Sequence, residues 1–262
     1  MINKIFNLSY TYQALIATLF TYFVTALGAS IVLFIKKLNK NFMDAMLSCA
    51  AGIMIAASFF SLIMPAISMA DDLKMVPFIV LSIGFLSGGI FLFICDKLFS
   101  KILKNNTNKN KRTLMLIFSI SLHNIPEGAA IGVAFGSLFY DLNSATIISA
   151  WMLALGIGIQ NFPEGAAISL PLRRDGYSRK KAFFLGQLSG IVEPIFGVIG
   201  AILVLKVRFL LPFLLSFAAG AMIYVVVEEL IPESQSNIKK EVMSLFTLLG
   251  FTIMMILDLA LG

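Results

Sequence analysis

The sequence predicts an all-α, polytopic membrane protein with eight transmembrane helices. Hydrophobic side chains make up 59% of its 262 residues and charged side chains 13%, whereas an ordinary soluble domain is about 25% charged. The apolar residues form continuous runs of about the 20 residues that a helix needs to cross a bilayer. Strands of a membrane barrel would instead alternate between apolar and polar residues over about 10 positions. A large soluble domain is therefore excluded.

Eight apolar runs account for most of the chain. The first is too long for a cleaved signal peptide, so we expect it to be retained. Residues 100–112 contain a stretch of Lys, Asn and Thr, which predicts a flexible cytoplasmic linker between the third and fourth runs. Residues 1–262 then form a single transmembrane domain. The runs lie near residues 11–35, 42–67, 76–99, 113–138, 144–172, 182–205, 209–231 and 242–261.

The 20 basic residues indicate the orientation of the chain in the membrane. Sixteen of them lie in the stretches 36–40, 97–112, 173–181 and 239–240, and four lie on the other side of the predicted spans. Because Lys and Arg gather on the cytoplasmic side, the sixteen should face the cytoplasm, and an even number of spans leaves both termini outside. We expect the plasma membrane as the location. The basic residues of the cytoplasmic stretches then explain the net charge of +6, and no nucleic-acid partner is required.

A nine-residue motif occurs twice inside the apolar runs. Residues 123–131 have the sequence HNIPEGAAI and residues 160–168 have QNFPEGAAI, so the two copies agree at seven of nine positions. They are 37 residues apart and lie on consecutive spans, which run in opposite directions. The copies are therefore related by inversion, and an inverted-repeat architecture of this kind is typical of secondary transporters.

Each copy places a nitrogen or amide ligand four residues before a glutamate. His123 precedes Glu127, and Gln160 precedes Glu164. Residues at i and i+4 share one face of a helix, so each pair should point in one direction. Intramembrane ionisable groups mark functional sites by default, and two mirrored pairs in one chain strengthen that interpretation.

The proline and glycine of each motif predict local features of the helices. Pro126 and Pro163 have no N–H group, so the carbonyl four residues earlier loses its partner and the helix should kink. Gly128 and Gly165 should permit a close approach between helices.

The motif residues should lie near the middle of the membrane. At 1.5 Å per residue, His123 lies about 16 Å past Arg112, and Glu193 in the sixth span lies about 18 Å past Lys181, within a core about 30 Å thick. No Lys or Arg lies inside these spans at the same depth. A bound cation or protons must therefore neutralise the buried carboxylates, and a divalent metal ion is the economical solution.

Charge counting favours one tightly bound ion. Neutral His123 and Gln160 with ionised Glu127 and Glu164 give a ligand set that balances one divalent cation. Nitrogen and oxygen donors suit Zn²⁺ as the transported substrate. Cd²⁺, Fe²⁺ and Mn²⁺ also fit, because the order of metal affinities does not confer selectivity by itself.

A second ion is predicted to bind more weakly. Asn124, Asn161 and Glu193 would lie beside it, and two divalent ions facing three carboxylates leave a net charge of +1.

These motifs resemble the ZIP (Zrt-, Irt-like) family of divalent metal-ion transporters, in particular its bacterial GufA-like branch. The resemblance rests on HNxPEG, QNxPEG and the run GQLSGIVEP at residues 186–194. It implies import of zinc and related ions into the cytoplasm, external termini, and an elevator-like movement of spans 1, 4, 5 and 6 against spans 2, 3, 7 and 8. It also implies a binuclear-type metal centre at His123, Asn124, Glu127, Gln160, Asn161, Glu164 and Glu193.

The chain departs from the family pattern at three places. Many members have His at the position of Gln160, and some have an acidic residue at the position of Asn161; both differences predict weaker metal binding here. Many relatives also have a His-rich loop between the third and fourth spans, whereas residues 100–112 contain no histidine. Metal sensing by that loop is not expected.

Two carboxylates at the cytoplasmic end of the seventh span, Glu228 and Glu229, are either solvated interfacial groups or metal ligands on an exit path. The principal alternative function is an intramembrane metal-dependent hydrolase, in which a zinc-bound water acts as nucleophile. The motif His-Glu-x-x-His is absent, however, and His123 is the only histidine. A proton-coupled carrier or a structural receptor without metal is a third hypothesis. We therefore expect no enzyme, with metal ions and the lipid bilayer as partners, and the sequence leaves a homodimer open.

Overall fold

The fold is known from a computed structural model that describes residues 8–34, 39–104, 109–141, 145–174 and 176–261. Within these ranges, the side chains at 99–100, 102–104, 109–120, 123, 171, 174 and 261 lie outside the description. The described backbone is helical apart from short connections, and no strand occurs in it. The all-α prediction is confirmed.

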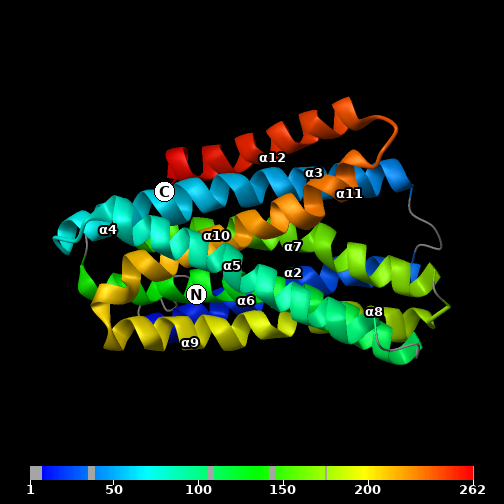
Figure 1. Ribbon diagram of the computed structural model, residues 1–262, viewed down its shortest axis with the longest axis horizontal. Coiled ribbons are helices and arrows are strands. Elements are labelled where there is room, and N and C mark those ends of the chain that lie inside the picture. Colours follow the sequence, from blue (N-terminus) through cyan, green and yellow to red (C-terminus); the bar gives the residue numbers. More distant parts are fainter. Residues whose placement is uncertain (1–7, 35–38, 105–108, 142–144, 175, 262) are drawn as a thin grey trace.

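The long helices lie roughly along one axis of the molecule (Figure 1). Short π-helical or 3₁₀ segments, labelled η, interrupt several of them. In chain order the elements are α2 (Tyr10–Phe34), α3 (Lys40–Ala57), η1 (Ser58–Ile63), α4 (Met64–Asp72), α5 (Pro77–Lys104), α6 (Lys109–Ser137), η2 (Leu138–Tyr140), α7 (Ile147–Arg174), α8 (Arg179–Leu188), η3 (Ser189–Ile191), α9 (Val192–Lys206), η4 (Arg208–Leu210), α10 (Leu211–Val225), η5 (Val226–Leu230), α11 (Ile231–Gln235) and α12 (Lys240–Leu261).

These boundaries lie within a few residues of the predicted apolar runs, with two local extensions. Six helical segments of the described chain are long and apolar enough to cross a membrane by length and composition. The two helices that carry the repeated motif, α6 and α7, have 29 and 28 residues and were not among those six. A polytopic membrane protein is therefore confirmed, while the number of eight spans stays a prediction.

Helical residues also enter the predicted cytoplasmic linker from both sides. The helix α5 continues to Lys104, and α6 begins at Lys109. The remaining linker residues, 105–108, lie outside the described part of the chain. The linker and the single-domain organisation stay predictions.

Several helix ends follow from local side-chain chemistry. The Asn39 side chain accepts a hydrogen bond from the Asn41 N–H at 2.9 Å, and the Ser178 hydroxyl accepts one from Lys181 N–H at 3.3 Å. Such N-caps satisfy backbone donors that have no partner inside the helix. Pro77 opens α5 and Pro212 lies in the first turn of α10, where a missing N–H costs nothing.

The helix ends define two poles of the molecule. At one pole, on the right in Figure 1, α3 begins at Lys40, α7 ends at Arg174, α8 begins at Arg179 and α12 begins at Lys240. We call it the basic end. The opposite end contains the start of α2 at Tyr10 and the last turns of α9 and α12. This division agrees with the grouping of basic residues seen in the sequence.

Four helix pairs make the most extensive contacts: α2 with α7, α6 with α9, α5 with α10, and α3 with α12. The first two pairs form one group, in which α2 also packs against α9. The other two pairs form a second group. Contacts of α3 with α7 and of α10 with α6 join the groups, and the repeated motif of α6 and α7 lies in the first of them.

A second inverted repeat relates α3–η1 to α10–η5. Residues 47–63 have the sequence LSCAAGIMIAASFFSLI and residues 215–231 have LSFAAGAMIYVVVEELI, which agree at nine of 17 positions. The two segments run in opposite directions, and their π-helical parts begin at equivalent positions, Ser58 and Val226. The sequence analysis missed this repeat, although the AAGxMI string is a sufficient signal for it.

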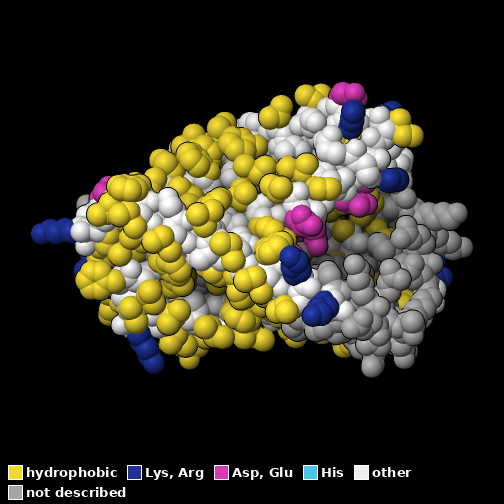
Figure 2. Space-filling view, in the orientation of Figure 1, with side chains coloured by type: hydrophobic (Ala, Val, Ile, Leu, Met, Phe, Trp, Pro, Cys, Tyr) yellow, Lys and Arg dark blue, Asp and Glu magenta, His cyan; other side chains and the backbone are white. Residues whose placement is uncertain are grey.

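The outer surface is suited to lipid. Figure 2 shows a face covered largely by hydrophobic side chains. Large side chains point outward on several helices, including Phe34, Phe78 and Leu259, which are 79%, 73% and 70% exposed. Apolar exposure on this scale is expected where the surrounding solvent is hydrocarbon.

Candidate metal site

The two copies of the motif lie on helices α6 and α7, which contact each other. Asn124 and Glu127 belong to α6, and Gln160, Asn161 and Glu164 belong to α7. Neither helix ends at its proline. The discontinuity lies instead in the sixth span, where the 3₁₀ segment η3 separates α8 from α9 just before Glu193.

The amide and carboxylate groups of the motif are buried between these helices. Asn124 and Asn161 are 0% exposed, and Glu127 and Gln160 are 1% exposed. The Gln160 Nε2 group donates a hydrogen bond to Glu127 Oε1 at 2.5 Å. This bond links the two copies of the motif directly.

Several buried polar atoms of the motif have no hydrogen-bond partner among the described residues. They are Glu127 Oε2, Gln160 Oε1, Asn161 Oδ1 and both side-chain polar atoms of Asn124. Buried polar atoms are almost always satisfied, and an exception calls for a reason such as an ion. Each of the four groups offers one unpaired oxygen, and such oxygens are suitable ligands for a divalent cation. The donor set therefore fits a metal ion.

The carboxylates of the site come within electrostatic range of one another. Glu127 experiences the charges of both Glu164 and Glu193. Among the described side chains, however, no group of three or more His, Cys, Asp or Glu is close enough to hold a metal ion. The histidine side chain of His123 lies outside that description, although its backbone belongs to α6. Among the described side chains, the candidate ligands are therefore carboxylates and amides together.

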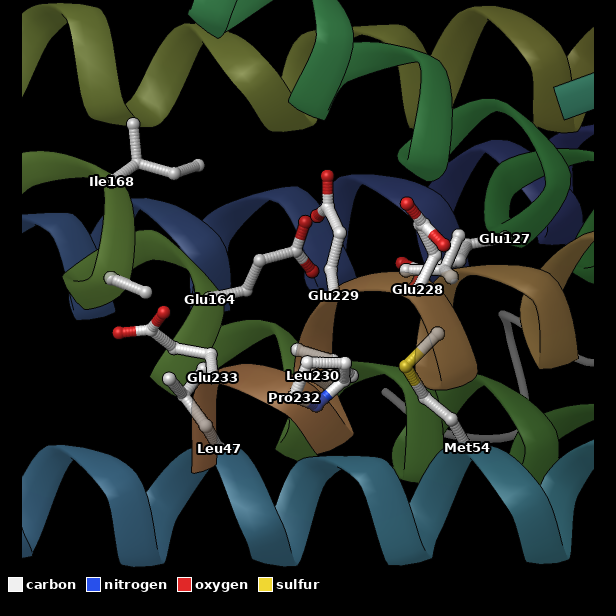
Figure 3. Close-up of a pocket in the computed structure, with 12 residues that line it drawn as sticks. Leu47, Met54, Glu127, Glu164, Ile168, Glu228, Glu229, Leu230, Pro232 and Glu233 are labelled. Atoms are coloured by element: carbon white, nitrogen blue, oxygen red, sulfur yellow. The ribbon is translucent and has the colours of Figure 1, made fainter. Parts of the chain in front are cut away.

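A cavity of about 460 Å³ leads from the site toward the basic end. Five glutamates line it: Glu127 and Glu164 of the motif, and Glu228, Glu229 and Glu233 of the seventh span. In Figure 3 the carboxyl groups of Glu164 and Glu229 point toward one another, and Glu228 lies beside Glu127. Figure 2 shows acidic side chains at the surface in the same half of the molecule. The structure thus brings the predicted exit-path residues into one acidic cavity with the motif glutamates.

The π-helical segment η5 carries Glu228 and Glu229. Isolated π-turns inside α-helices are frequent at functional sites. Here the segment places two consecutive carboxylates on the wall of the cavity. Met54 of α3 is 3% exposed and also lines this cavity.

Glu193 is not among the residues that line the cavity. Its carboxylate accepts a hydrogen bond from Asn161 Nδ2 at 2.9 Å and another from the hydroxyl group of Thr21. Thr25 lies against the same carboxylate. The sequence analysis predicted Asn161 and Glu193 but missed both threonines, which form no motif; their spacing of four residues on an apolar helix is the only signal for them.

The motif glycines allow the helices to approach closely, as predicted. A Cβ atom at Gly128 would collide with the backbone carbonyl of Glu193 in α9, and one at Gly165 would collide with the carbonyl of Thr25 in α2. Packing of small residues is how membrane helices associate at short range. The two contacts place the motif helices against the helices that carry the Glu193 network.

The fold and this site define a class: a polytopic helical membrane protein with a buried cluster of carboxylate and amide side chains. Comparison with known proteins then gives the family. The profile of the ZIP Zinc transporter family matches residues 104–258. The chain belongs to this family, and its function is therefore metal-ion transport and not an enzymatic reaction.

Individual relatives match over nearly their full length. Zinc transporter ZIP11 of Homo sapiens is 35% identical over 97% of this chain and 98% of its own. Zinc transporter GufA of Myxococcus xanthus is 34% identical over 95% of this chain and 98% of its own. Zinc transporter ZIPB of Bordetella bronchiseptica is 33% identical over 91% and 78%, respectively. The predicted resemblance to ZIP proteins with GufA-like members is confirmed.

Proposed function

We propose that the chain imports divalent metal ions, zinc foremost, through a site near the middle of the membrane on the fourth, fifth and sixth of eight spans. The relatives are named zinc transporters, which supports zinc as substrate. Cd²⁺, Fe²⁺ and Mn²⁺ stay predicted substrates on the chemistry of the ligands. The homodimer and the plasma membrane also stay predictions.

The observation that carries the proposal is the coincidence of unpaired acceptors with an acidic cavity. Glu127 Oε2 and Gln160 Oε1 have no hydrogen-bond partner among the described residues, and Glu127 also lines the cavity. A cation that reaches the site would find these oxygens already desolvated and would have the cavity open to it. We propose His123, Glu127, Gln160 and Glu164 as its ligands, with Asn124 beside them.

Two further pairs of residues have proposed roles along the same route. Glu228 and Glu229 are exit-path ligands, because they line the cavity between the site and the basic end. For Asn161 and Glu193, which the sequence predicts as ligands of a second, weaker ion, the hydrogen bonds of Glu193 favour a structural role instead. With Asn124 they complete the predicted metal-binding set.

The test is uptake of divalent ions by purified protein in liposomes, measured over a panel that includes Zn²⁺, Cd²⁺, Fe²⁺ and Mn²⁺. Saturable Zn²⁺ uptake supports the proposal, whereas hydrolysis of a substrate without ion movement would support the intramembrane hydrolase instead. Protein-free liposomes provide the control for leakage.

Import requires that the basic end face the cytoplasm. Cysteine substitutions at Ser178, which is exposed at the basic end, and at Asp72, which is exposed at the opposite end, test this orientation. On intact cells an impermeant thiol reagent should label Asp72→Cys and leave Ser178→Cys unlabelled. The reverse labelling pattern would place the basic end outside the cell and contradict the proposed import.

Ion binding should release protons. A metal ion needs His123 neutral and the glutamates ionised, so protons compete for the same groups. Binding should weaken from about pH 7.5 to 5.5, the range in which His titrates. Metal titration in weak buffer, with the released protons followed by a pH indicator, measures this coupling; binding that is independent of pH over that range contradicts it.

A further inference from the structure

Glu193 is bound from two sides by other helices. Its Oε2 accepts the hydroxyl hydrogen of Thr21 in α2, and its Oε1 accepts the amide hydrogen of Asn161 in α7 at 2.9 Å. Glu193 itself lies in the first turn of α9 and is 0% exposed. One carboxylate thus joins three helices of the same helix group.

The surroundings of Glu193 explain how a carboxylate is tolerated in an apolar interior. The start of a helix carries partial positive charge, which favours an acidic side chain in the first turn. Hydrogen bonds to a charged acceptor are about twice as strong as those between neutral groups. These hydrogen bonds therefore offset part of the cost of burying the Glu193 carboxyl group between the helices.

This arrangement differs from that of Glu127, the other fully enclosed glutamate of the site. Glu127 has a second oxygen without a hydrogen-bond partner among the described residues, and it lines the cavity. Both oxygens of Glu193 accept hydrogen bonds, and Glu193 is not part of the cavity lining. A cation at Glu193 would have to displace donors that already fit the carboxylate.

The packing around Glu193 leaves little room for an ion. A Cβ atom at Gly190 would lie 3.1 Å from Thr25 and 3.2 Å from Glu193 Oε1. The backbone of Glu193 is also in close contact with Gly128 of α6. Movement of this residue would therefore disturb the helix that carries Glu127.

We infer that Glu193 is a positioning residue which fastens α2, α7 and α9 together through Thr21 and Asn161, so that the protein carries one ion and not two. The inference rests on the proposed metal site, since Asn161 adjoins the proposed ligand Gln160 in α7. By holding Asn161, the network fixes the turn of α7 that presents Gln160 and Glu164 to Glu127.

The decisive comparison is between Glu193→Gln and Glu193→Ala. Glutamine keeps the shape and both contacts, because its carbonyl accepts from Asn161 and the Thr21 hydroxyl can reverse to accept from its amide. Alanine loses both. We expect Glu193→Gln to retain the wild-type stoichiometry of one ion, the KM and the maximal rate. Glu193→Ala should lower the maximal rate by about tenfold, the equivalent of one or two buried hydrogen bonds, with KM little changed.

A second pair of variants keeps the inference testable if Glu193→Ala does not fold. Thr21→Val removes the hydroxyl group and should lower the maximal uptake rate, whereas Thr21→Ser should restore it. If Glu193 were a metal ligand, Thr21→Val would free one carboxylate oxygen and strengthen a second ion. Strengthened binding in that variant overturns the inference.

The variant Asn161→Asp provides a positive control for detecting a second ion. It replaces the amide donor with a carboxylate beside Glu193, and two adjacent carboxylates require a cation or a proton between them. Isothermal titration should then find two ions, and adding Glu193→Gln should return the count to one. This control shows that the assay responds to a second site when one exists.

The outcomes separate the two proposals. Two ions in the unmodified protein, with one lost in Glu193→Gln, would overturn the positioning role and leave the transporter standing. A loss of uptake in Glu193→Gln as large as that in Glu193→Ala would also overturn it. No ion binding and no uptake by the unmodified protein would instead defeat the proposed function.

Discussion

Two hollows, a large cavity and a small pocket, lie beside the motif helices α6 and α7. They differ in volume and in the kind of side chains that line them. The cavity at the basic end has a volume of about 460 Å³, whereas the pocket toward the opposite end has about 20 Å³. Both are lined by the second, fourth, fifth and seventh helical stretches. The large cavity is acidic, and the small pocket contains hydroxyl groups from Ser61, Ser137, Thr146 and Ser149.

The repeated sequences make this comparison instructive. Leu47 of the large cavity and Leu215 of the small pocket occupy equivalent repeat positions, as do Glu229 and Ser61. The two repeated segments thus line one cavity each, and carboxylates occur among the lining residues of the large cavity alone. Only the large cavity is lined by the motif glutamates Glu127 and Glu164. In this structure, Glu127 and Glu164 therefore adjoin the large cavity and not the small pocket.

The largest effect should come from the glutamates at the inner part of the large cavity. Glu127→Ala or Glu164→Ala leaves one unit of ion charge uncompensated, which costs about 2.5–3.5 kcal/mol at the bilayer centre. Zn²⁺ uptake at low concentration should fall roughly a hundredfold. Ser149→Ala in the small pocket is the control and should transport normally. Near-normal Zn²⁺ uptake by either glutamate variant would contradict a functional difference between the large cavity and the small pocket.

Chemical accessibility offers a direct test of the difference in size. Ala167 lines the large cavity and Ala134 lines the small pocket, and both are partly buried. In a background without Cys49 and Cys95, Ala167→Cys should react readily with an impermeant thiol reagent applied from the basic end. Ala134→Cys should react slowly from either side. Zn²⁺ should protect Ala167→Cys, and equal reactivity of the two positions would contradict the asymmetry.

The close packing that holds the motif helices in place should be sensitive to one methyl group. Gly128→Ala and Gly165→Ala force a Cβ atom onto a backbone carbonyl, and overpacking of this kind typically costs about 1–3 kcal/mol. The thermal midpoint in detergent should fall for both variants. Gly89→Ala is the matched control, because its nearest neighbour would be 3.7 Å away. A similar midpoint for all three variants would mean that the contacts are not tight.

The smallest effect should come from the carboxylates further along the large cavity. Glu228→Gln and Glu229→Gln remove charge from exposed side chains, where screening by water limits the loss to roughly two- to fivefold in uptake rate. The maximal rate should change more than KM. An effect as large as that of Glu127→Ala would show that Glu228 and Glu229 belong to the principal metal site.

Much of the fold was predictable because hydrophobic runs in a membrane protein directly mark its helices. The sequence also predicted that α6 and α7 carry the site. The polar residues of the repeated strings HNxPEG and QNxPEG are not needed for packing in lipid. The close approach at Gly128 and Gly165 followed from the same string. Predicted and observed helix boundaries differ by a few residues where polar side chains continue a helix beyond the apolar run.

Other parts required the three-dimensional structure. The π-turns have no composition of their own, so η1 and η5 were not predicted. Thr21 is an ordinary residue of an apolar helix until α9 brings Glu193 against it. The kinks at Pro126 and Pro163 stay predictions, since α6 and α7 continue past both prolines, whereas the 3₁₀ segment η3 in the sixth span was not predicted. The difference in volume between the large cavity and the small pocket depends on the conformation of the protein. Two similar repeated sequences do not predict it.

The paired π-turns have a consequence for how the chain tolerates insertions and deletions. A π-turn accommodates about one residue more than the α-helical turn it replaces, so everything beyond it is rotated relative to an uninterrupted helix. Removing Val227 from η5 would restore a regular helix and swing the following turn by about 100°. Glu229 and Pro232 would then leave the wall of the cavity together. The spacing between AAGxMI and the next proline is therefore as much a functional element of this chain as the charged residues it carries.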